Sequence, residues 1–200
     1  MKEKKGSLDV KKRCGWVTDD DIYIAYHDEE WGRRLYTDQK LFELLCLEGA
    51  QAGLSWLTIL KRREAYREAF DNFEPEIISQ YNEDKIRSLL KNEKIIRNKL
   101  KVKSVVTNAQ AYLRIVEGGR SFSDYLWQFV DGEPVKNKWG DLKDVPALTE
   151  RSEAMSKQLK KDGFKFVGPT ICYAFMQASG MVNDHVTDCF CYKEIHEGRR

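Results

Sequence analysis

The sequence contains no apolar run long enough to span a bilayer, and residues 1–10 lack the apolar stretch of a signal peptide. These absences argue against a membrane partner and predict a cytoplasmic protein. Internal repeats and low-complexity segments are absent as well. A chain of 200 residues with this composition is expected to form one ordinary domain, or two small interlocked ones, around a substantial core.

Charge of one sign is not in large excess, because 34 Lys and Arg residues nearly balance 32 Asp and Glu residues. The molecule as a whole is therefore not a polycation, and binding to nucleic acid would need a local basic patch. The candidates are the basic runs at residues 11–13, 61–63, 94–103 and 160–165. Taken singly, each run is more typical of a solvated helix face.

Cysteines number five, an odd count in a chain without an export signal, so a disulfide framework is not expected. Metal-bound thiols and simply buried thiols are the interpretations that remain. No histidine is placed in the sequence to activate Cys46 or Cys172, which makes a cysteine-nucleophile enzyme a remote third choice.

Strict alternation of apolar and polar residues is also missing, and this predicts an all-α fold. Thr37 and Ser55 are expected to cap two helices. The longest helix is predicted over about 94–117, before two glycines, with an apolar stripe at three- and four-residue spacing. Residues 131–149 predict a long loop, followed by helices over about 151–161 and 169–179.

The segment Gly163–Gly168 joins the last two predicted helices and carries the first chemical signal. Its glycines permit backbone conformations and close approaches that a Cβ would prevent. The second helix begins at Pro169 and Thr170, and its free N–H groups are suited to phosphate oxygens, with Lys165 adding a positive charge. Such a contact would position the protein on DNA without reading bases. An ordinary helical hairpin with a glycine cap is the alternative.

Two cysteines and two histidines, near opposite ends of the chain, form a candidate metal site: Cys14, His27, His185 and Cys189. A Cys₂His₂ set is closed and tetrahedral, which indicates structural rather than catalytic zinc. The spacing of His185 and Cys189 is that of one helical turn, which would place both side chains on one face. Cys191 is close enough to compete with Cys189, and simple burial of the thiols is the alternative.

Glu48 follows Leu41, Leu44 and Leu45 at helical spacing, so its carboxylate is expected on the apolar face of a helix. Such a placement is costly unless the charge is paired or used. A buried salt bridge is one explanation. The other is a pocket for an extruded base, in which a carboxylate reads the base edge and rings stack on its faces. Nearby aromatic residues for this role are Trp16, Tyr23, Tyr26 and Trp56, although each is equally compatible with a core position.

Taken together, these motifs resemble the bacterial 3-methyladenine DNA glycosylase I family, within the helix-hairpin-helix DNA glycosylases. The resemblance covers about residues 13–192 and rests on six segments: 14–16, 23–28, 30–32, 47–56, 163–168 and 182–186. The expected organisation is a basic extension at 1–12, a glycosylase domain at 13–192 with its helix-hairpin-helix at about 151–180, and a tail at 193–200.

The resemblance implies an all-α helix-hairpin-helix fold whose termini are joined by one structural Zn²⁺ on the Cys₂His₂ set. It implies that Glu48 contacts the methylated base, with Tyr26 and Trp56 against its ring and Trp16 and Tyr23 completing the pocket. The expected DNA contacts are Gln51, Gly53, Leu54 as a wedge, Gly163, Lys165, Gly168 and Thr170. The implied substrate is double-stranded alkylated DNA, and the implied oligomeric state is a monomer.

Asn183 stands where most of this superfamily carries a catalytic aspartate, and Asp184 is the carboxylate beside it. No lysine occupies a position expected for Schiff-base chemistry, so the prediction is a monofunctional enzyme that leaves an abasic site. Two alternatives remain open. One is a non-catalytic, zinc-stabilised DNA-binding module, and the other is a glycosylase of the same fold with a different damaged-base specificity.

Overall fold

The computed structural model describes residues 11–197, which form mostly helices and loops with one pair of two-residue strands. The α-helices are α1 (Asp21–Glu29), α2 (Asp38–Gln51), α3 (Trp56–Leu60), α4 (Arg63–Ala69), α5 (Pro75–Ile78), α6 (Glu83–Leu89), α7 (Lys99–Glu117), α8 (Phe122–Trp127), α9 (Glu150–Lys161), α10 (Pro169–Ala178) and α11 (Phe190–His196). The short 3₁₀ helices are η1 (Asp71–Phe73), η2 (Gln128–Val130) and η3 (Leu142–Asp144). No helix in this part of the chain is long and apolar enough to cross a membrane.

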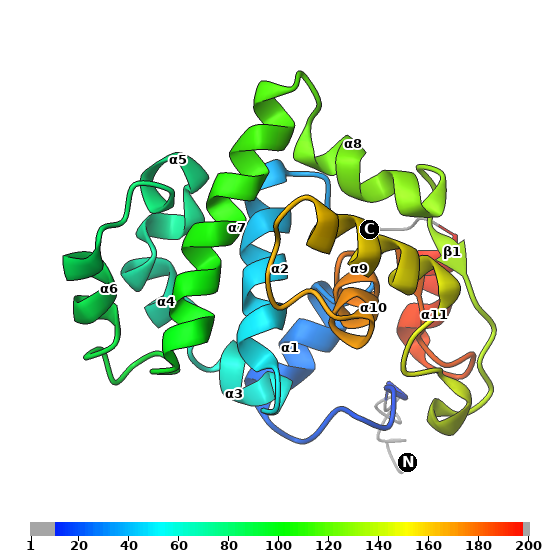
Figure 1. The fold of residues 1–200 in the computed structure, drawn as a ribbon. Helices are drawn as coiled ribbons and strands as arrows, with labels where there is room; N and C mark the ends of the chain where they lie inside the picture. Colours follow the sequence, from blue (N-terminus) through cyan, green and yellow to red (C-terminus); the bar gives the residue numbers. More distant parts are fainter. Residues whose placement is uncertain (1–10, 198–200) are drawn as a thin grey trace, which may run out of the picture.

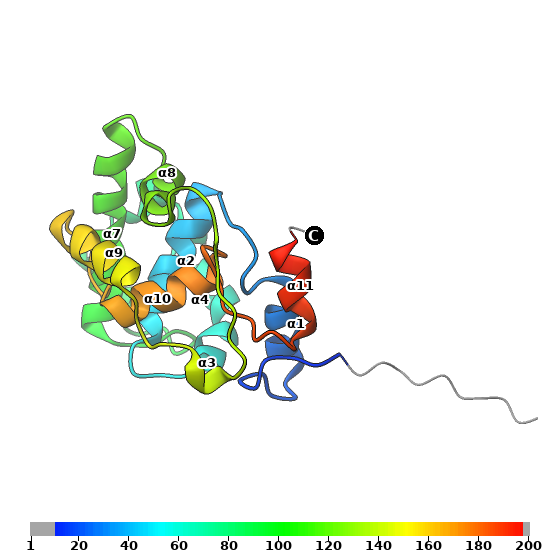
Figure 2. The same cartoon turned by 90° about the vertical axis from the view of Figure 1, so that its right-hand side faces the viewer.

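Helix α2 runs through the middle of the molecule and packs against α3, α7, α8 and α10 (Figure 1). Helices α4, α5 and α6 lie beyond α7 on one side, and the α9–α10 pair lies on the other. Figure 2 shows α1 and α11, the first and last helices, on the same side of the molecule. The ends of the described chain are therefore brought together beside the central core.

Helix α2 begins where the sequence predicts, but the side chain of its N-cap residue does not cap it. Thr37 occupies the N-cap position, but its side chain makes no capping hydrogen bond. The carboxylate of Asp38, the first residue of α2, interacts with the start of another helix, α8. There it accepts hydrogen bonds of 2.9 Å from the backbone N–H groups of Phe122 and Ser123. An anionic side chain at a helix N-terminus is favourable because it meets unpaired N–H donors. The same residue thus ties α8 to the central helix.

Helix α7 is the longest element, and it begins five residues later than the sequence predicts. Asn98 stops the helix from extending further toward the N-terminus, because its Oδ1 accepts hydrogen bonds from the backbone N–H groups of Leu100 and Lys101. Ile95 is buried, but it lies in the loop before α7 and not in the helix. An apolar residue at helical spacing was therefore not evidence for a helix at that position; the capping asparagine marks the boundary.

Helices α9 and α10 form the predicted hairpin, and the turn between them is tightly held. Gly163 has φ +100°, a conformation that favours glycine. Asn108 of α7 grips Lys165 through both of its backbone groups, accepting from its N–H at 2.8 Å and donating to its carbonyl at 3.2 Å. A Cβ on Gly49 of α2 would lie 3.1 Å from the Cβ of Phe166, so the missing side chain allows the turn to pack closely on α2.

Residues 131–149 form mostly loop, with one feature that the all-α prediction did not include. Strand β1 (Val135–Lys136) pairs in parallel with β2 (Val182–Asn183), in the register Val135 with Val182 and Lys136 with Asn183. Such short strands leave little alternation to read in a sequence. The pairing fastens the long loop to the segment that carries His185.

Candidate functional site

A cavity of about 200 Å³ lies between α1, α2, α3, α10 and η3. Its lining contains every residue that the sequence suggested for a base pocket, together with the side chains of several other segments. The lining residues are Trp16, Tyr23, Tyr26, Trp31, Glu48, Gln51, Trp56, Leu142, Val145, Ala174, Gln177 and Asp184. The cavity is therefore assembled from both ends and the middle of the chain.

Glu48 is the unusual member of this lining, because its side chain is buried without an ionic partner. Only 4% of the residue is exposed, and no hydrogen bond or ion pair reaches its carboxylate from residues 11–197. Glu43, on the preceding part of α2, is equally buried but accepts from Arg67 at 2.7 Å and from Lys40 at 2.9 Å. The salt-bridge explanation thus fits Glu43 and does not fit Glu48.

Burial raises the pKa of Glu48 to about 8, because removal from water disfavours the charged form. The pKa values of Tyr23 and Tyr26 are raised as well, first by burial and then by the nearby Glu48 carboxyl. A cationic ligand in the cavity would favour the carboxylate again. The site is therefore suited to a ligand that brings positive charge.

Aromatic rings form the walls around this carboxyl group. Trp16 lies 5.0 Å from Tyr23 and Tyr26 lies 5.5 Å from Trp56, measured between ring centroids. The Nε1–H group of Trp56 is buried with no hydrogen-bond partner among the described residues. A buried donor without a partner costs free energy that a ligand acceptor would recover. Flat apolar walls, a free donor and a carboxyl group suit a planar heteroaromatic ligand.

Besides Asp184 and the expected DNA contact Gln51, five lining residues had no role assigned from the sequence: Trp31, Leu142, Val145, Ala174 and Gln177. Of these five, Trp31 alone could have been found from the sequence, because it lies within the motif segment 30–32. The others come from η3, its flanking loop and α10, and no local pattern marks them as neighbours of Glu48. Only the packing of α10 and the long loop against α2 brings them to the cavity.

Asp184 also lines the cavity, and its carboxylate is held by four neutral donors. Oδ1 accepts from Asn137 and Trp139 at 2.7 Å each, while Oδ2 accepts from Tyr173 at 2.6 Å and Gln177 at 2.7 Å. These bonds occupy the carboxylate and fix its position in the wall. The neighbouring Asn183 is buried in β2, outside the lining of the cavity.

Next to the cavity, the four candidate metal ligands are gathered into one buried cluster. The ligand atoms of Cys14, His27, His185 and Cys189 all lie within 4.8 Å of one another. The Sγ atoms of Cys14 and Cys189 each lie 3.5 Å from Nδ1 of His185, and Cys189 Sγ lies 3.5 Å from Nε2 of His27. In tetrahedral zinc sites, sulfur and nitrogen ligands are about 3.5 Å apart. The donor set and its spacing both fit Zn²⁺.

The remaining ring nitrogens of the two histidines are also engaged. Nδ1 of His27 lies 2.8 Å from the Asp28 carboxylate, which receives a two-pronged contact from Arg13. Nε2 of His185 lies 3.1 Å from the carbonyl oxygen of Trp31. Oriented histidines of this kind are typical of metal ligands, because the outer hydrogen bond selects the tautomer that leaves the other nitrogen free to coordinate.

His185 and Cys189 meet through a turn, so the helical spacing expected from sequence is not the reason that they are adjacent. Cys189 is the N-cap residue of α11, and His185 lies in the loop before it. Cys191 is fully buried in α11, and its Sγ contacts the carbonyl oxygen of His27 at 3.9 Å. It belongs to a second, smaller group with His27 and Asp28, which shares His27 with the Cys₂His₂ set.

The loop between α2 and α3, residues 52–55, carries the candidate wedge Leu54 and is called the wedge loop below. Gly53 has φ +76°, and Leu54 is 40% exposed. Lys101 of α7 donates to the carbonyl oxygens of Ala50 at 2.8 Å and Ala52 at 2.6 Å, which satisfies acceptors at the end of α2. Gln51 lines the cavity directly before this loop. An exposed leucine thus stands at the edge of the pocket on a supported turn.

The hairpin lies further along α7. Lys165 and Thr170 are exposed, and Gly168 is the N-cap of α10. Lys101 of α7 holds the wedge loop, and Asn108 of the same helix holds the hairpin. The two residues are seven positions apart, which is about 10 Å along a helix. Helix α7 therefore fixes the spacing of these two surface features.

Comparison with known proteins places nearly the whole chain within one group. Residues 16–192 match the family model described as methyladenine glycosylase. The chain is 51% identical over 179 residues to the DNA-3-methyladenine glycosylase of Haemophilus influenzae, covering 90% of this chain and 97% of that protein. It is 50% identical over 181 residues to DNA-3-methyladenine glycosylase 1 of Escherichia coli K12, with the same coverage.

Solved structures agree with this likeness. A crystal structure of 3-methyladenine DNA glycosylase I superposes with a TM-score of 0.89 at 52% identity, covering 90% of this chain and 99% of the other. A structure from Staphylococcus aureus that describes the basis of 3-methyladenine recognition superposes with a TM-score of 0.87 at 41% identity, covering 89% of this chain and 95% of the other.

Proposed function

The chain belongs to the methyladenine glycosylase family, and from this membership we propose that it removes 3-methyladenine from alkylated DNA by hydrolysing the N-glycosidic bond. The single observation that carries the assignment to this site is the buried Glu48 carboxyl, which lies in an aromatic cavity without a partner among residues 11–197. A passive DNA-binding module would have no use for a recessed carboxyl whose burial is costly.

The chemistry of the lesion explains why this site is sufficient. Methylation at N3 makes the adenine base a cation, so its bond to C1′ is weak and the bonding electron pair leaves with a neutral base. Water then adds to C1′ and loses a proton, which leaves an abasic site. The enzyme needs mainly to extrude, orient and stabilise the nucleotide. Glu48 supplies recognition and electrostatic stabilisation rather than a proton.

The aromatic residues complete the proposed pocket. Tyr26 and Trp56 lie against the base ring, and Trp16 and Tyr23 close the remaining side. The unpartnered Nε1–H of Trp56 donates to an acceptor on the base. Asp184 acts as a fixed part of the wall, because four donors already occupy its oxygens. This favours a mechanism without a strong catalytic base.

The lining of the cavity also supports a monofunctional enzyme. It contains no lysine among the described residues, so no amine is placed to form a Schiff base with the sugar. Double-stranded DNA is the proposed substrate form, with Leu54 filling the gap left by the extruded base. The backbone is held by the hairpin through Gly163, Lys165, Gly168 and Thr170. The proposed oligomeric state is a monomer, and the proposed location is the bacterial cytoplasm, where the DNA lies.

One structural Zn²⁺ is proposed on Cys14, His27, His185 and Cys189, whose separations fit a tetrahedral site. The ion would cross-link the two ends of the domain and perform no step of the reaction. His27 follows Tyr26 in α1, and the rings of Trp16 and His27 are 5.2 Å apart. Metal binding would therefore stiffen one wall of the pocket.

The direct test of the function is chromatography of the free bases that the purified protein releases from methylated duplex DNA. We expect free 3-methyladenine, and we expect the DNA strand to remain intact until abasic sites are cleaved chemically. Release of a different methylated base would keep the fold and change the specificity. A strand break made by the protein alone would contradict the monofunctional assignment.

The raised pKa of Glu48 predicts the pH dependence of excision. The free enzyme holds Glu48 largely protonated below about pH 8, whereas the cationic lesion is best met by the carboxylate. We therefore expect kcat/KM to rise with pH up to about 8 and then to level off, because this parameter reports ionisations of the free enzyme. The measurement is excision rate against pH at low substrate. A Glu48→Gln variant that kept the same rising limb would rule out this carboxyl as its origin.

A further inference from the structure

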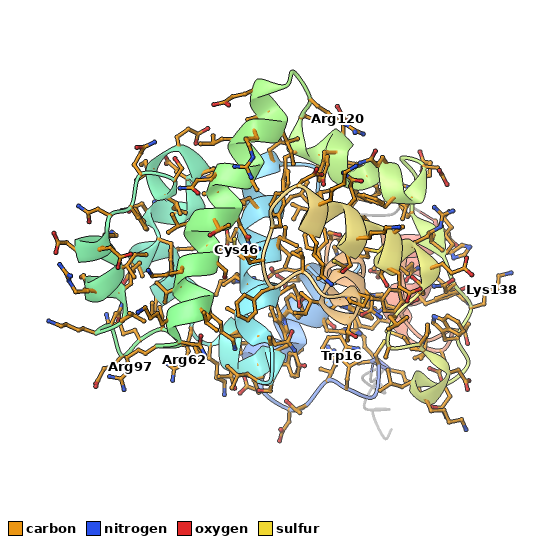
Figure 3. The ribbon with its side chains drawn as sticks, in the orientation of Figure 1. Trp16, Cys46, Arg62, Arg97, Arg120 and Lys138 are labelled. Atoms are coloured by element: carbon orange, nitrogen blue, oxygen red, sulfur yellow. The ribbon has the colours of Figure 1, made fainter. Side chains whose placement is uncertain are left out.

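Beyond the hairpin, the molecule has a second basic feature close to the wedge loop. A shallow hollow is lined by Thr58, Lys61, Arg62, Ala65 and Lys94. It lies at the far end of α3, whose N-cap Ser55 directly follows Leu54. In Figure 3, Arg62 and the nearby Arg97 lie along the same lower edge of the molecule as Trp16 of the cavity.

Arg62 is fixed in place without using its charge. Its NH1 group donates to the backbone carbonyls of Glu93 at 3.1 Å and Lys94 at 3.0 Å. No carboxylate pairs with it among residues 11–197. The guanidinium therefore keeps its positive charge and its other N–H donors available at a rigid position, which suits a phosphate oxygen.

Two other cations of this surface are held only by exposed pairs. Arg97 contacts Glu93 at 3.2 Å, and Lys94 reaches Glu68 only at 3.9 Å. Lys61 contacts the partly exposed Asp20 at 2.5 Å. Exposed pairs contribute little to stability and are screened by salt. Exchange of Glu93 and Glu68 for phosphates is therefore inexpensive.

The surface continues into the first turn of α7, which carries Lys99 and Leu100. Leu100 is 70% exposed, more than any other large apolar side chain in the described chain. The next residue, Lys101, is the one that binds the carbonyls of Ala50 and Ala52 below the wedge. Lys101 thus ties the wedge loop to the first turn of α7, the turn that carries Lys99.

Along α7, the residue that supports the wedge loop lies between the basic residues and the residue that supports the hairpin. Lys94 and Arg97 precede the helix, Lys101 supports the wedge loop, and Asn108 supports the hairpin. We propose that the flanking basic surface, defined as Lys61, Arg62, Lys94, Arg97 and Lys99, binds the phosphate backbone on the side of the lesion away from the hairpin. The proposal rests on the function proposed above.

Two-sided binding has a clear physical purpose. Extruding a base costs free energy in unstacking and unpairing, and bending the duplex around a wedge adds to that cost. A single hairpin contact would leave one arm of the duplex free to straighten. Phosphate contacts on both sides hold the bent form and release counterions, which contributes directly to affinity.

The test compares Lys94→Glu/Arg97→Glu, which reverses two charges, with Lys138→Glu, which reverses one charge on a different edge of the molecule (Figure 3). Binding is measured to a duplex that carries a tetrahydrofuran abasic analogue, over a range of salt concentrations. The double variant should bind at least tenfold more weakly at low salt. Its log–log salt slope should be shallower by about 2, because each lost phosphate contact removes about 0.9. The control should match the wild type.

A second measurement identifies which arm of the duplex is involved. Duplexes are shortened on one side of the abasic analogue at a time. For the wild type, shortening the arm that meets the flanking basic surface should weaken binding, and the double variant should be insensitive to that same truncation. Shortening the other arm should affect both proteins equally, through the hairpin.

The outcomes separate this inference from the proposed function. At saturating methylated duplex, the double variant should still release 3-methyladenine, because the base pocket is unchanged. Equal affinity, salt slope and truncation response in both proteins would overturn the flanking contact while excision stands. No released base from the wild type would overturn the proposed function, whatever the binding data show. Thermal melting confirms that the variants are folded.

Discussion

Replacing Glu48 with glutamine is expected to lower kcat/KM for 3-methyladenine excision by about 10²–10³-fold, the usual loss when one preorganised electrostatic group is removed from an active site. Glutamine keeps the shape of the side chain and its ability to hydrogen-bond, so the lost element is the negative charge that meets the cationic base. The measurement is single-turnover release of base from methylated duplex, with binding to an abasic-analogue duplex recorded separately. The loss should lie in excision and not in DNA affinity.

Glu43→Gln is the matched control, because it removes the other buried carboxylate of α2. Glu43 is paired with Arg67 and Lys40, so its replacement leaves charged partners without an acceptor and should cost stability. Its excision rate, measured where the variant is folded, should stay near the wild-type rate. A Glu48→Gln variant that retained activity within about threefold would remove this carboxyl from the mechanism.

Glu43→Gln and Glu48→Gln should change the free energy of unfolding in opposite directions above about pH 8. The pKa of Glu48 is raised to about 8 in the folded protein from an ordinary value of 4.5, so the folded state favours the neutral form. For the wild type, stability is then lost progressively as pH rises from about 4.5 to about 8. Glu48→Gln removes this loss and should be more stable than the wild type at pH 9, with little difference at pH 4. Urea denaturation at both pH values measures the effect.

Removal of the metal is expected to produce the second large effect. Cys189→Ser should abolish stoichiometric zinc and lower the free energy of unfolding by several kcal/mol, since metal binding to a preformed site adds to folding stability. The cluster around the ligands is small and separate from the main core. We therefore expect the joined ends of the chain to loosen first, with a fall in excision because Trp16 and Tyr26 lose their support.

Metal analysis and thermal melting measure this effect, with two cysteine controls. Cys46→Ala changes a thiol in the main core, and Cys191→Ala changes the thiol beside the cluster. Both should retain one zinc per chain. Loss of zinc in Cys191→Ala would identify it as a ligand in place of Cys189. A wild-type protein that contained no zinc and melted at the same temperature after chelation would contradict the metal assignment.

Local sequence signals were sufficient to predict α2, α3, α7, α9 and α10 and to mark Glu48 as a candidate site residue. Helical spacing marked the apolar face of α2, and the carboxyl of Glu48 is an evident exception to the apolar pattern on that face. The same signals misplaced the start of α7, where Asn98 ends the helix although apolar spacing continues to Ile95. They also assigned a helical turn between His185 and Cys189, where the chain instead turns and begins α11 at Phe190.

The residue types of the candidate site could be read from the sequence: a carboxyl on an apolar face, aromatic neighbours, a glycine hairpin, and cysteines and histidines at the two ends. The packing of distant segments was needed to show that Glu48 has no partner within residues 11–197 while Glu43 has two, and that four donors occupy Asp184. It also placed η3 and α10 against the cavity. The physical reason is that chemistry and helix periodicity are local properties of a chain, whereas pairing, burial and pKa depend on which distant segments pack together.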